Sequence, residues 1–310
     1  MQYVVGGDIG GTNMRFALIS KDGKIVKKTR SETADNKEKI VEKVLRLIKN
    51  FSEDALLVSI GVGGVVNFPK GEVVYTPNFN FSDVPLKRLV QKRFNLPCIV
   101  DNDANLAAWG EKTYGIAKQM KNFVCITLGT GIGGGLVING NIYRGAFSAA
   151  GEIGHTTIGY ASDVKAFSLK ADYENMASGS ALAQLARKTL NKKRQSLIWE
   201  LAKGDTKRIT GKIVTAAARQ GDGTAIKLLE RQAEILAIGL ANLANVVDPE
   251  AIIISGGMAA DADLLLPKLK NSLYKRLFAS DYRKPQVLIG KLGPDAGVLG
   301  AAALAFYPYG

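Results

Sequence analysis

The sequence predicts an α/β fold of two similar lobes with a cleft between them, and three observations lead to this prediction. Short apolar runs alternate with segments of helical periodicity, which indicates a largely parallel sheet. The stretches GDIGGTNMRFALISKDGKIV and CITLGTGIGGGLVINGNIY share one order of strand, Gly-Thr turn, strand, tight turn and strand. The length of 310 residues suggests about two domains. We therefore expect one lobe over residues 1–117 and a second over residues 118–310.

Strands are predicted where apolar runs are bounded by turn residues, and the Asp-Gly and Asn-Gly pairs between such runs predict hairpins. The expected strands are Tyr3–Asp8, Met14–Ser20, Lys24–Arg30, Leu56–Val62, Cys98–Asp101, Phe123–Leu128, Gly134–Ile138, Ala251–Ser255 and Gln286–Ile289.

Helices are predicted where apolar residues recur every three or four positions, as at Ile40, Val44, Leu47 and Ile48. The expected helices are Lys37–Lys49, Leu86–Phe94, Asn105–Tyr114, Gly179–Leu190, Thr224–Val246 and Ala296–Phe306. The polar stretch Lys192–Lys212 is expected to be partly helical, with loops. We expect the last helix, 296–306, to pack back on the first lobe.

Composition favours a globular protein, with 46% hydrophobic and 22% charged residues. No apolar run reaches the length of a membrane span, and the N-terminus does not resemble a signal peptide. Cys98 and Cys125 lie in apolar runs, as buried thiols of a cytoplasmic protein would. We therefore expect a cytoplasmic protein that does not contact a membrane.

The formal net charge of +13 raises the question of an anionic partner. The basic residues are dispersed, and the densest patches, Arg187–Arg194 and Lys207–Lys212, are not interleaved with aromatic residues. We therefore expect solvated surface charge with a bias toward phosphorylated ligands, and no nucleic-acid partner.

The two Gly-Thr turns are the first candidate ligand site. Glycine lets backbone amides approach a ligand closely, and consecutive amides bind anions. Two such turns facing across a cleft could hold a polyphosphate from both sides. Asp8, directly before the first turn, could then hold Mg²⁺ through water molecules.

Two commoner phosphate motifs do not fit. Gly204–Ile213 resembles a P-loop, but its spacer is too long and Ile213 stands where Ser or Thr is needed. Gly129–Gly134 matches G-x-G-x-x-G, but a strand follows it instead of a helix, so a Rossmann site is excluded.

Three further segments carry candidate chemistry. Asp103 follows a predicted strand, and it is either a helix N-cap or the base that accepts a proton from a substrate hydroxyl. Glu152 and His155, the only histidine, could bind vicinal hydroxyls of a polyol. The Gly256–Gly257 pair is either a plain strand-to-loop stop or a flat surface under a nucleotide base.

Taken together, these motifs resemble the ROK family of sugar kinases, especially its glucokinases. DIGGTN resembles the first phosphate motif, NDAN the catalytic-aspartate motif, LGTGIGGG the second phosphate motif, GEIGH the sugar-binding signature and ISGG the adenosine motif. The five motifs occur in the family's order and span nearly the whole chain. The resemblance implies an actin-like sugar kinase fold that uses ATP and Mg²⁺, and a homodimer.

The resemblance also implies residue roles, with Asp103 as the general base. It implies hexose contacts at Gly63, Gly64, Asn78, Asn102, Asp103, Glu152, His155 and Glu174. It implies nucleotide and phosphate contacts at Asp8, Gly10, Gly11, Thr12, Asn13, Arg15, Thr130, Gly131, Gly256 and Gly257. Asn13 and Arg15 depart from the lysine-containing form of the first motif, and Arg15 would supply a cation there.

One departure concerns zinc. Many family members carry a cysteine-rich zinc motif between the GEIGH histidine and the next glutamate, but here the interval TTIGYASDVKAFSLKADY has no cysteine. We expect no structural zinc, so His155 needs another partner to fix its tautomer, and what supports the hexose site in place of the zinc loop is left open.

The resemblance favours phosphorylation of glucose to glucose 6-phosphate and leaves alternatives. The hexose could instead be mannose, fructose, N-acetylglucosamine or N-acetylmannosamine, or the enzyme could be a broad hexokinase; polyphosphate could replace ATP. A sugar-responsive transcriptional regulator of this family carries a helix-turn-helix segment before the first motif, and here that motif starts at Asp8. The remaining alternative, a non-kinase ATPase or filament protein, does not explain the set of sugar-facing residues.

Overall fold

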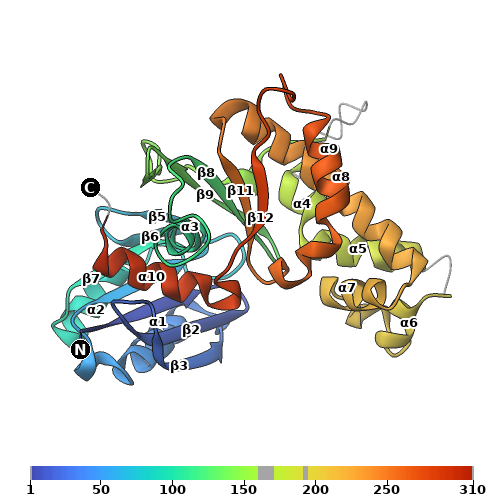
Figure 1. Ribbon diagram of the computed structural model, residues 1–310. Coiled ribbons are helices and arrows are strands. Elements are labelled where there is room, and N and C mark those ends of the chain that lie inside the picture. Colours follow the sequence, from blue (N-terminus) through green and yellow to red (C-terminus); the bar gives the residue numbers. More distant parts are fainter. Residues whose placement is uncertain (1, 160–170, 191–194, 309–310) are drawn as a thin grey trace. The chain divides into compact units, whose positions relative to one another are not determined.

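The computed structural model describes residues 2–159, 171–190 and 195–308. The chain divides into two compact units, shown in Figure 1. Unit 1 comprises Met1–Cys125, Gly135–Gly151 and Gly290–Gly310, and unit 2 comprises Ile126–Gly134 and Glu152–Ile289. Among the described residues, no helix has the length and apolar character to span a membrane.

A five-stranded sheet in the order β3-β2-β1-β4-β7 forms the centre of unit 1. Its strands are β1 (Tyr3–Ile9), β2 (Asn13–Ser20), β3 (Ile25–Glu32), β4 (Val58–Val62) and β7 (Cys98–Asn102). The first three strands pair antiparallel, whereas β4 runs parallel to both β1 and β7. The carboxyl ends of β1, β4 and β7 therefore meet at one edge of the sheet.

The helices of unit 1 bury the apolar faces that the sequence predicts. They are α1 (Lys37–Lys49), α2 (Leu86–Phe94), α3 (Asp103–Thr113) and α10 (Ala296–Phe306). The predicted face of α1 is buried at Ile40, Val44, Leu47 and Ile48. Unit 1 also contains the hairpin of β5 (Val65–Asn67) and β6 (Glu72–Tyr75).

Helix α10 packs on α3 and on β1, as Figure 1 shows near the sheet of unit 1. A Cβ at Gly300 would overlap the carbonyl oxygen of Leu106, so the two helix backbones approach each other closely. This contact fixes α3, whose first turn carries Asp103, against the rest of the unit.

The second sheet repeats the order of the first, as β10-β9-β8-β11-β12. Its strands are β8 (Phe123–Leu128), β9 (Ile132–Ile138), β10 (Asn141–Ile142), β11 (Ala251–Ser255) and β12 (Gln286–Ile289). The β9–β10 pair is antiparallel and the β11–β12 pair is parallel, as in the matching part of the first sheet. The internal repeat predicted from the sequence is therefore present.

Six helices of unit 2 are described: α4 (Tyr173–Ala177), α5 (Gly179–Leu190), α6 (Leu197–Leu201), α7 (Gly211–Arg219), α8 (Gly223–Val247) and α9 (Leu266–Tyr274). Short 3-10 helices occur at Ser52–Asp54, Ile153–His155, Thr206–Arg208, Ala259–Leu264 and Gly293–Asp295. Helix α6, the segment Thr206–Arg208 and the first two residues of α7 form the helical part of Lys192–Lys212, of which residues 192–194 lie outside the described part of the chain.

Candidate active site

The first Gly-Thr turn joins β1 to β2. The amide of Gly10 donates to the carbonyl of Asn13 at 3.0 Å, and the Thr33 hydroxyl donates to the carbonyl of Gly10 at 2.6 Å. Gly11 and Thr12 are exposed, and no acceptor for their amides is found among the described residues. Two available amides and a hydroxyl can bind an anion such as a phosphate group.

Asp8 and Arg15 lie opposite each other on β1 and β2. Arg15 Nη1 is 3.4 Å from Asp8 Oδ2. Burial raises the pKa of the Asp8 carboxyl, and the Arg15 charge and hydrogen bond partly offset this. The predicted cation of the first motif is therefore in place beside its acid.

The donors at Asp8 fit the magnesium site that the sequence predicts. Mg²⁺ keeps several waters and needs only one or two carboxylates when substrate phosphates supply further oxygens. A single carboxylate beside a phosphate-binding turn meets this need. In the described part of the chain, no cluster of three or more His, Cys, Asp or Glu side chains offers a cage for a metal.

Asp103 lies at the edge where the parallel strands of unit 1 end. Its Oδ2 atom would be 3.4 Å from a Cβ at Gly63, which directly follows β4. Asp103 is the first residue of α3, whereas Asn102 is the N-cap. The N-cap alternative for Asp103 is therefore wrong, because Asn102 already caps the helix.

Asn102 uses both ends of its amide group. Its Oδ1 accepts hydrogen bonds from the amides of Ala104 and Asn105 at 2.8 and 3.0 Å, and its Nδ2 donates to the carbonyl of Gly64 at 3.0 Å. Gly64 has φ +131, a conformation that residues with a side chain rarely adopt. Asn102 therefore connects the start of α3 to the Gly63–Gly64 loop.

Asn78 lies beside the first Gly-Thr turn. A Cβ at Gly11 would be 3.3 Å from both the Cβ and the carbonyl oxygen of Asn78. Asn78 is exposed, so its side chain is accessible to a ligand. Unit 1 therefore contains one predicted hexose contact next to a predicted phosphate contact.

The second Gly-Thr turn, between β8 and β9, has the same open backbone. The amide of Gly129 donates to the carbonyl of Gly131 at 3.0 Å and closes the turn. No acceptor for the amides of Thr130 and Gly131 is found among the described residues, and Thr130 is exposed. The turn can therefore bind an anion in the same way as the first one.

Glu174, in α4, lies against this second turn. Its Oε2 accepts a hydrogen bond from the amide of Ile132 at 2.8 Å. A Cβ at Gly131 would overlap the same carboxylate. Glu174 therefore supports the turn with one oxygen, and no partner for its other oxygen is found among the described residues.

Glu152 directly precedes the 3-10 helix Ile153–His155, and His155 is its last residue. Their Oε2 and Nε2 atoms are 3.9 Å apart, and the His155 side chain is 49% exposed. Burial raises the pKa of the Glu152 carboxyl, His155 lowers it, and the neighbouring charge of Glu174 raises it again. Glu152 and Glu174, the two carboxylates of unit 2 that we expect at the hexose, are thus close enough for the charge of Glu174 to affect the pKa of Glu152.

The expectation of no zinc concerns a segment that is largely not described. Residues 160–170, the central part of the cysteine-free interval, lie outside the described residues. Both cysteines are buried, and burial raises the pKa of the Cys98 thiol to about 12 and that of Cys125 further. Both thiols therefore lie in apolar surroundings, as expected for buried cysteines.

Gly256 and Gly257 lie beside the second Gly-Thr turn. Gly256 has φ +88 and packs on the backbone of Leu128, and the amide of Met258 donates to the carbonyl of Leu128 at 2.9 Å. The Gly257 amide nitrogen would be 3.9 Å from a Cβ at Gly129. The predicted adenosine and phosphate motifs of unit 2 are therefore adjacent.

A pocket of about 480 Å³ opens beside these glycines. Its lining combines predicted residues with residues of α5, of the turn before α7, of the start of α7 and with Met258: Gly129, Thr130, Gly179, Ser180, Ala183, Gln184, Arg187, Ile209, Thr210, Gly211, Lys212, Gly257 and Met258. The Arg187 guanidinium donates to the carbonyl of Ile209 at 2.8 Å and so connects two walls of the pocket. The volume and the mixed lining suit a small organic ligand.

Sequence reasoning missed the α5 side of this pocket. Arg187 and Lys212 belong to the two basic patches, for which we expected solvated surface charge with a bias toward phosphorylated ligands, and both residues line this pocket. The available signal was the position of both patches close in sequence to short glycine-containing segments.

The predicted residues thus lie in two groups, each inside one unit. The group of unit 1 comprises Asp8, Gly10, Gly11, Thr12, Asn13, Arg15, Gly63, Gly64, Asn78, Asn102 and Asp103. The group of unit 2 comprises Thr130, Gly131, Glu152, His155, Glu174, Gly256 and Gly257.

The chain is similar to characterised kinases over nearly its whole length. The model of the ROK family matches residues 4–307. A glucokinase of Streptomyces coelicolor is 35% identical, with 99% of each chain covered, and a glucokinase of Thermotoga maritima is 33% identical, with 97% of this chain and 96% of the relative covered. A xylose repressor of Caldicellulosiruptor bescii is 30% identical, with 97% of this chain and 77% of the repressor covered.

The similarity extends to solved structures. The crystal structure of a ROK family glucokinase from Streptomyces griseus, in complex with glucose and AMPPNP, superposes with a TM-score of 0.88 at 34% identity and covers 97% of this chain and 98% of its own. The predicted α/β fold of the actin-like sugar kinase type is confirmed. The five ordered motifs, the repeated sheet and the matched family model lead to one conclusion, which is that this chain belongs to the ROK family.

Proposed function

We propose that this protein is an ATP-dependent hexose kinase that converts glucose to glucose 6-phosphate and ADP. The observation that carries the proposal is the likeness, over nearly the whole chain, to a glucokinase solved with glucose and AMPPNP. The chemistry of both residue groups agrees with it, because each group combines an anion-binding turn with side chains that can bind hydroxyl groups.

In the proposed reaction Asp103 is the general base. It accepts the proton of the hexose 6-hydroxyl as that oxygen attacks the γ-phosphorus in line and ADP leaves. Its carboxylate lies beside Gly63, where the absence of a side chain leaves room for a substrate. Asn102, Asn78, Glu152, His155 and Glu174 bind the other hydroxyls, and Asn102 also holds the Gly63–Gly64 loop.

The phosphates are bound by the two Gly-Thr turns, through the amides of Gly11, Thr12, Thr130 and Gly131. Mg²⁺ held at Asp8 through water would offset negative charge on the phosphates. Arg15 adds a positive charge and keeps the Asp8 carboxyl oriented by its contact at 3.4 Å. The adenosine occupies the pocket of unit 2, over Gly256–Gly257 and beside Arg187.

Two neighbouring functions are kept as alternatives. A kinase for mannose, fructose, N-acetylglucosamine or N-acetylmannosamine, or a broad hexokinase, would use the same residues. A sugar-responsive regulator is favoured by one observation, the similarity to a xylose repressor. A regulator would bind the hexose without transferring phosphate to it.

The deciding experiment is a coupled ADP-release assay over a panel of hexoses, with ATP and inorganic polyphosphate as donors. We expect turnover with glucose and ATP in the presence of Mg²⁺, and none without a sugar. ATP hydrolysis that no hexose stimulates, or hexose binding by calorimetry without turnover, would refute the proposal. Polyphosphate-driven glucose phosphorylation in the absence of ATP would change the assigned donor.

We further propose a cytoplasmic homodimer without structural zinc. The oligomeric state is measured by light scattering coupled to gel filtration, and a monomeric mass would contradict it. Elemental analysis of the purified protein tests the metal content, and one zinc per chain would refute the zinc prediction.

A further inference from the structure

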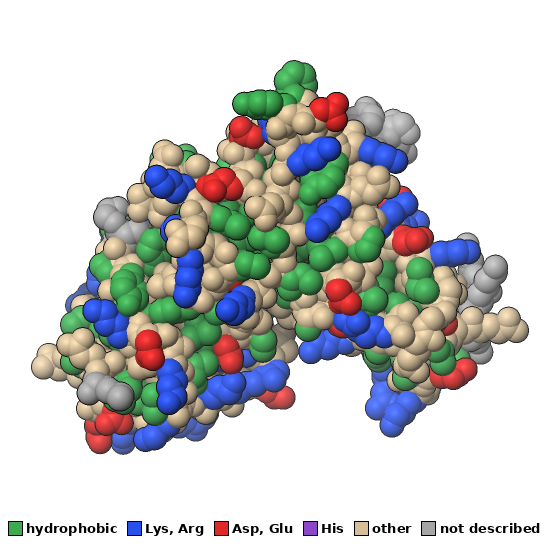
Figure 2. All heavy atoms as spheres, in the orientation of Figure 1, with side chains coloured by type: hydrophobic (Ala, Val, Ile, Leu, Met, Phe, Trp, Pro, Cys, Tyr) green, Lys and Arg blue, Asp and Glu red, His purple; other side chains and the backbone are tan. Residues whose placement is uncertain are grey.

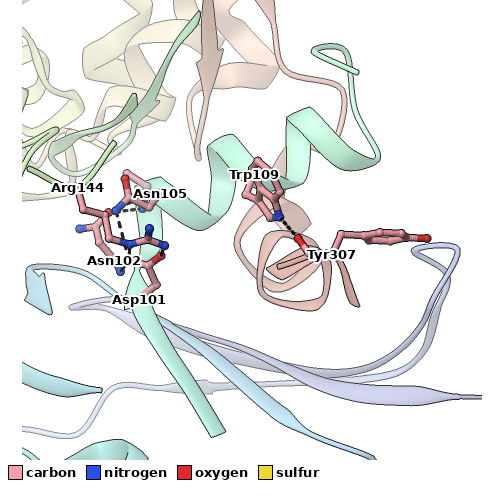
Figure 3. Close-up of polar contacts among 7 residues, drawn as sticks. Asp101, Asn102, Asn105, Trp109, Arg144 and Tyr307 are labelled. Atoms are coloured by element: carbon pink, nitrogen blue, oxygen red, sulfur yellow. Dashed lines mark hydrogen bonds and ion pairs between the residues drawn. The ribbon is translucent and has the colours of Figure 1, made fainter. Parts of the chain in front are cut away.

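A buried ion pair lies directly under the proposed catalytic turn. Arg144 Nη2 is 2.6 Å from Asp101 Oδ2, and the side chains of Arg144 and Asp101 are 13% and 2% exposed. Asp101 is in β7, two residues before Asp103, whereas Arg144 follows β10. Figure 3 shows Arg144, Asp101 and Asn105 together at the start of α3.

Arg144 holds Asp101 by both carboxylate oxygens, since its Nε also lies 3.4 Å from Oδ1. The same Oδ1 accepts hydrogen bonds from the backbone amide of Asn102 at 2.8 Å and from Asn105 Nδ2 at 3.3 Å. The orientation of this carboxylate therefore helps to fix the backbone that carries Asn102 and Asp103.

Arg144 also contacts the loop that follows Gly63 and Gly64. Its guanidinium carbon is 3.6 Å from the ring centroid of Phe68, which follows β5. A planar guanidinium can stack on an aromatic ring and bind a carboxylate through two nitrogens at once, which an ammonium group cannot do. One side chain thus joins β7, the start of α3 and the β5–β6 hairpin.

We propose that Arg144 is a positioning residue for phosphoryl transfer, which orients Asp101 so that Asn102 and Asp103 are held in their productive geometry. The proposal rests on the proposed kinase function. Arg144 does not need to contact a substrate for this role, because Asp101 and the Asn102 backbone transmit its effect.

The physical basis is the fixed geometry of the ion pair. Burial raises the pKa of the Asp101 carboxyl, and the charge and hydrogen bond of Arg144 partly offset this rise, so the ion pair stabilises the charged form of this buried acceptor. Lysine at position 144 would retain the opposite charge but would lose the two-nitrogen contact and the stacking. A small displacement of a catalytic group can cost about 10²-fold in rate.

The test compares Arg144→Lys, Phe68→Leu and the wild type. We expect Arg144→Lys to lower kcat at least roughly 10-fold while the KM for ATP stays within about twofold, because displacement of the base affects the chemical step. Phe68→Leu, which removes only the stacking, is expected to lower kcat less. Both variants should keep the melting temperature close to that of the wild type.

Arg283→Lys is the matched control. Arg283 also forms an arginine–carboxylate pair, with Nε 3.1 Å from Asp248 Oδ1, and its side chain is 20% exposed. It belongs to the other unit, and we place no site residue among its partners. We expect its kcat to equal that of the wild type. A kcat for Arg144→Lys within twofold of the wild type, or an equal loss in Arg283→Lys, would overturn the proposal.

A second readout does not depend on activity. Hydrogen exchange by mass spectrometry should show faster exchange at the amides of 102–105 in Arg144→Lys and no change there in Arg283→Lys. Unchanged exchange would overturn the positioning role, even if kcat falls. If the wild type shows no kinase activity on any sugar, the proposed function fails, and faster exchange in Arg144→Lys alone would still support the positioning of this turn.

Discussion

Glu174 Oε2 accepts a hydrogen bond from the backbone amide of Ile132 at 2.8 Å. A side chain expected at the hexose is therefore also a support of the second phosphate-binding turn. One carboxylate oxygen of Glu174 supports the turn, and the other is expected to bind the hexose. Substitutions that keep or remove the acceptor of the Ile132 amide should therefore distinguish these two roles.

We expect Glu174→Gln to raise the KM for the hexose by roughly 10- to 100-fold, because the loss of one hydrogen bond to a charged group costs about 1.5–3 kcal/mol. The KM for ATP should change little, because the glutamine oxygen can still accept from Ile132. Glu174→Ala should raise both the KM for the hexose and the KM for ATP, because alanine offers no acceptor to the Ile132 amide. Steady-state kinetics with each substrate varied checks this, and an unchanged KM for ATP in Glu174→Ala would show that the turn does not need this support.

Asp103→Asn tests the general base. We expect kcat to fall by about 10²–10⁴-fold, because asparagine cannot accept the proton of the 6-hydroxyl. Hexose affinity measured by calorimetry should stay within a few-fold of the wild type. Asp54→Asn, which changes an exposed acid of the same unit, is the control and should leave kcat unaltered. Turnover of Asp103→Asn close to that of the wild type would mean that another group is the base.

The sequence predicted the long, periodic elements well and the short ones poorly. Helix α1 is present because its apolar residues recur with a helical period, and all nine expected strands are present, most of them as short runs rich in apolar residues. The β5–β6 hairpin and α4 were missed because strands of three and four residues and a helix of five residues carry no measurable period. Such elements are stabilised by contacts with neighbouring elements, and these contacts leave no pattern in the local sequence. Helices α7 and α9, of nine residues each, were also missed.

The candidate site shows the same difference between features that have a local sequence pattern and features that depend on contacts between distant residues. Glycine-threonine turns could be predicted because their chemistry is local, and so could Asp103. The pairing of Asp101 with Arg144 joins residues 43 positions apart, and nothing near either residue in the sequence predicts it. Arg187 was also missed, because a charged residue in an amphipathic helix is usually solvated.

Lys212→Met tests the nucleotide pocket. Lys212 lines the pocket beside Gly211, and its ammonium can contact a phosphate or ribose oxygen. We expect the KM for ATP to rise roughly 10-fold, which corresponds to about 1.4 kcal/mol, while the KM for glucose stays the same. Lys207→Met is the matched control, because Lys207 belongs to the same basic patch and does not line the pocket. Equal effects of both changes would indicate a general effect of charge on nucleotide binding.

Glu152→Gln should have opposite effects on the thermal stability of the protein and on its affinity for the hexose. Burial raises the pKa of Glu152 above its ordinary value, so the folded state binds the proton more tightly than the unfolded chain does. This contribution to stability is fully present below the unfolded pKa and is lost as the pH rises through the folded pKa. At neutral pH the wild type therefore bears the cost of a partly buried charge that glutamine lacks, so Glu152→Gln should melt at a higher temperature than the wild type while it binds the hexose more weakly.

The difference in melting temperature should shrink as the pH falls toward 4.5, the ordinary pKa of this group. Asp222→Asn is the control, because its effect on thermal stability should have the opposite sign. Burial alone would raise the pKa of Asp222, but the hydrogen bonds from the amides of Ala225 and Leu197 and from Ser196 lower it overall. This substitution should therefore destabilise the protein at neutral pH, with an effect that fades only below pH 3.8, the ordinary pKa of Asp222. Thermal melts of both variants and the wild type from about pH 2.5 to pH 8 provide the comparison, because this range extends below the ordinary pKa of both groups. A Glu152→Gln variant that is less stable than the wild type at pH 7 would show that the Glu152 carboxylate is a net stabilising group in the folded protein.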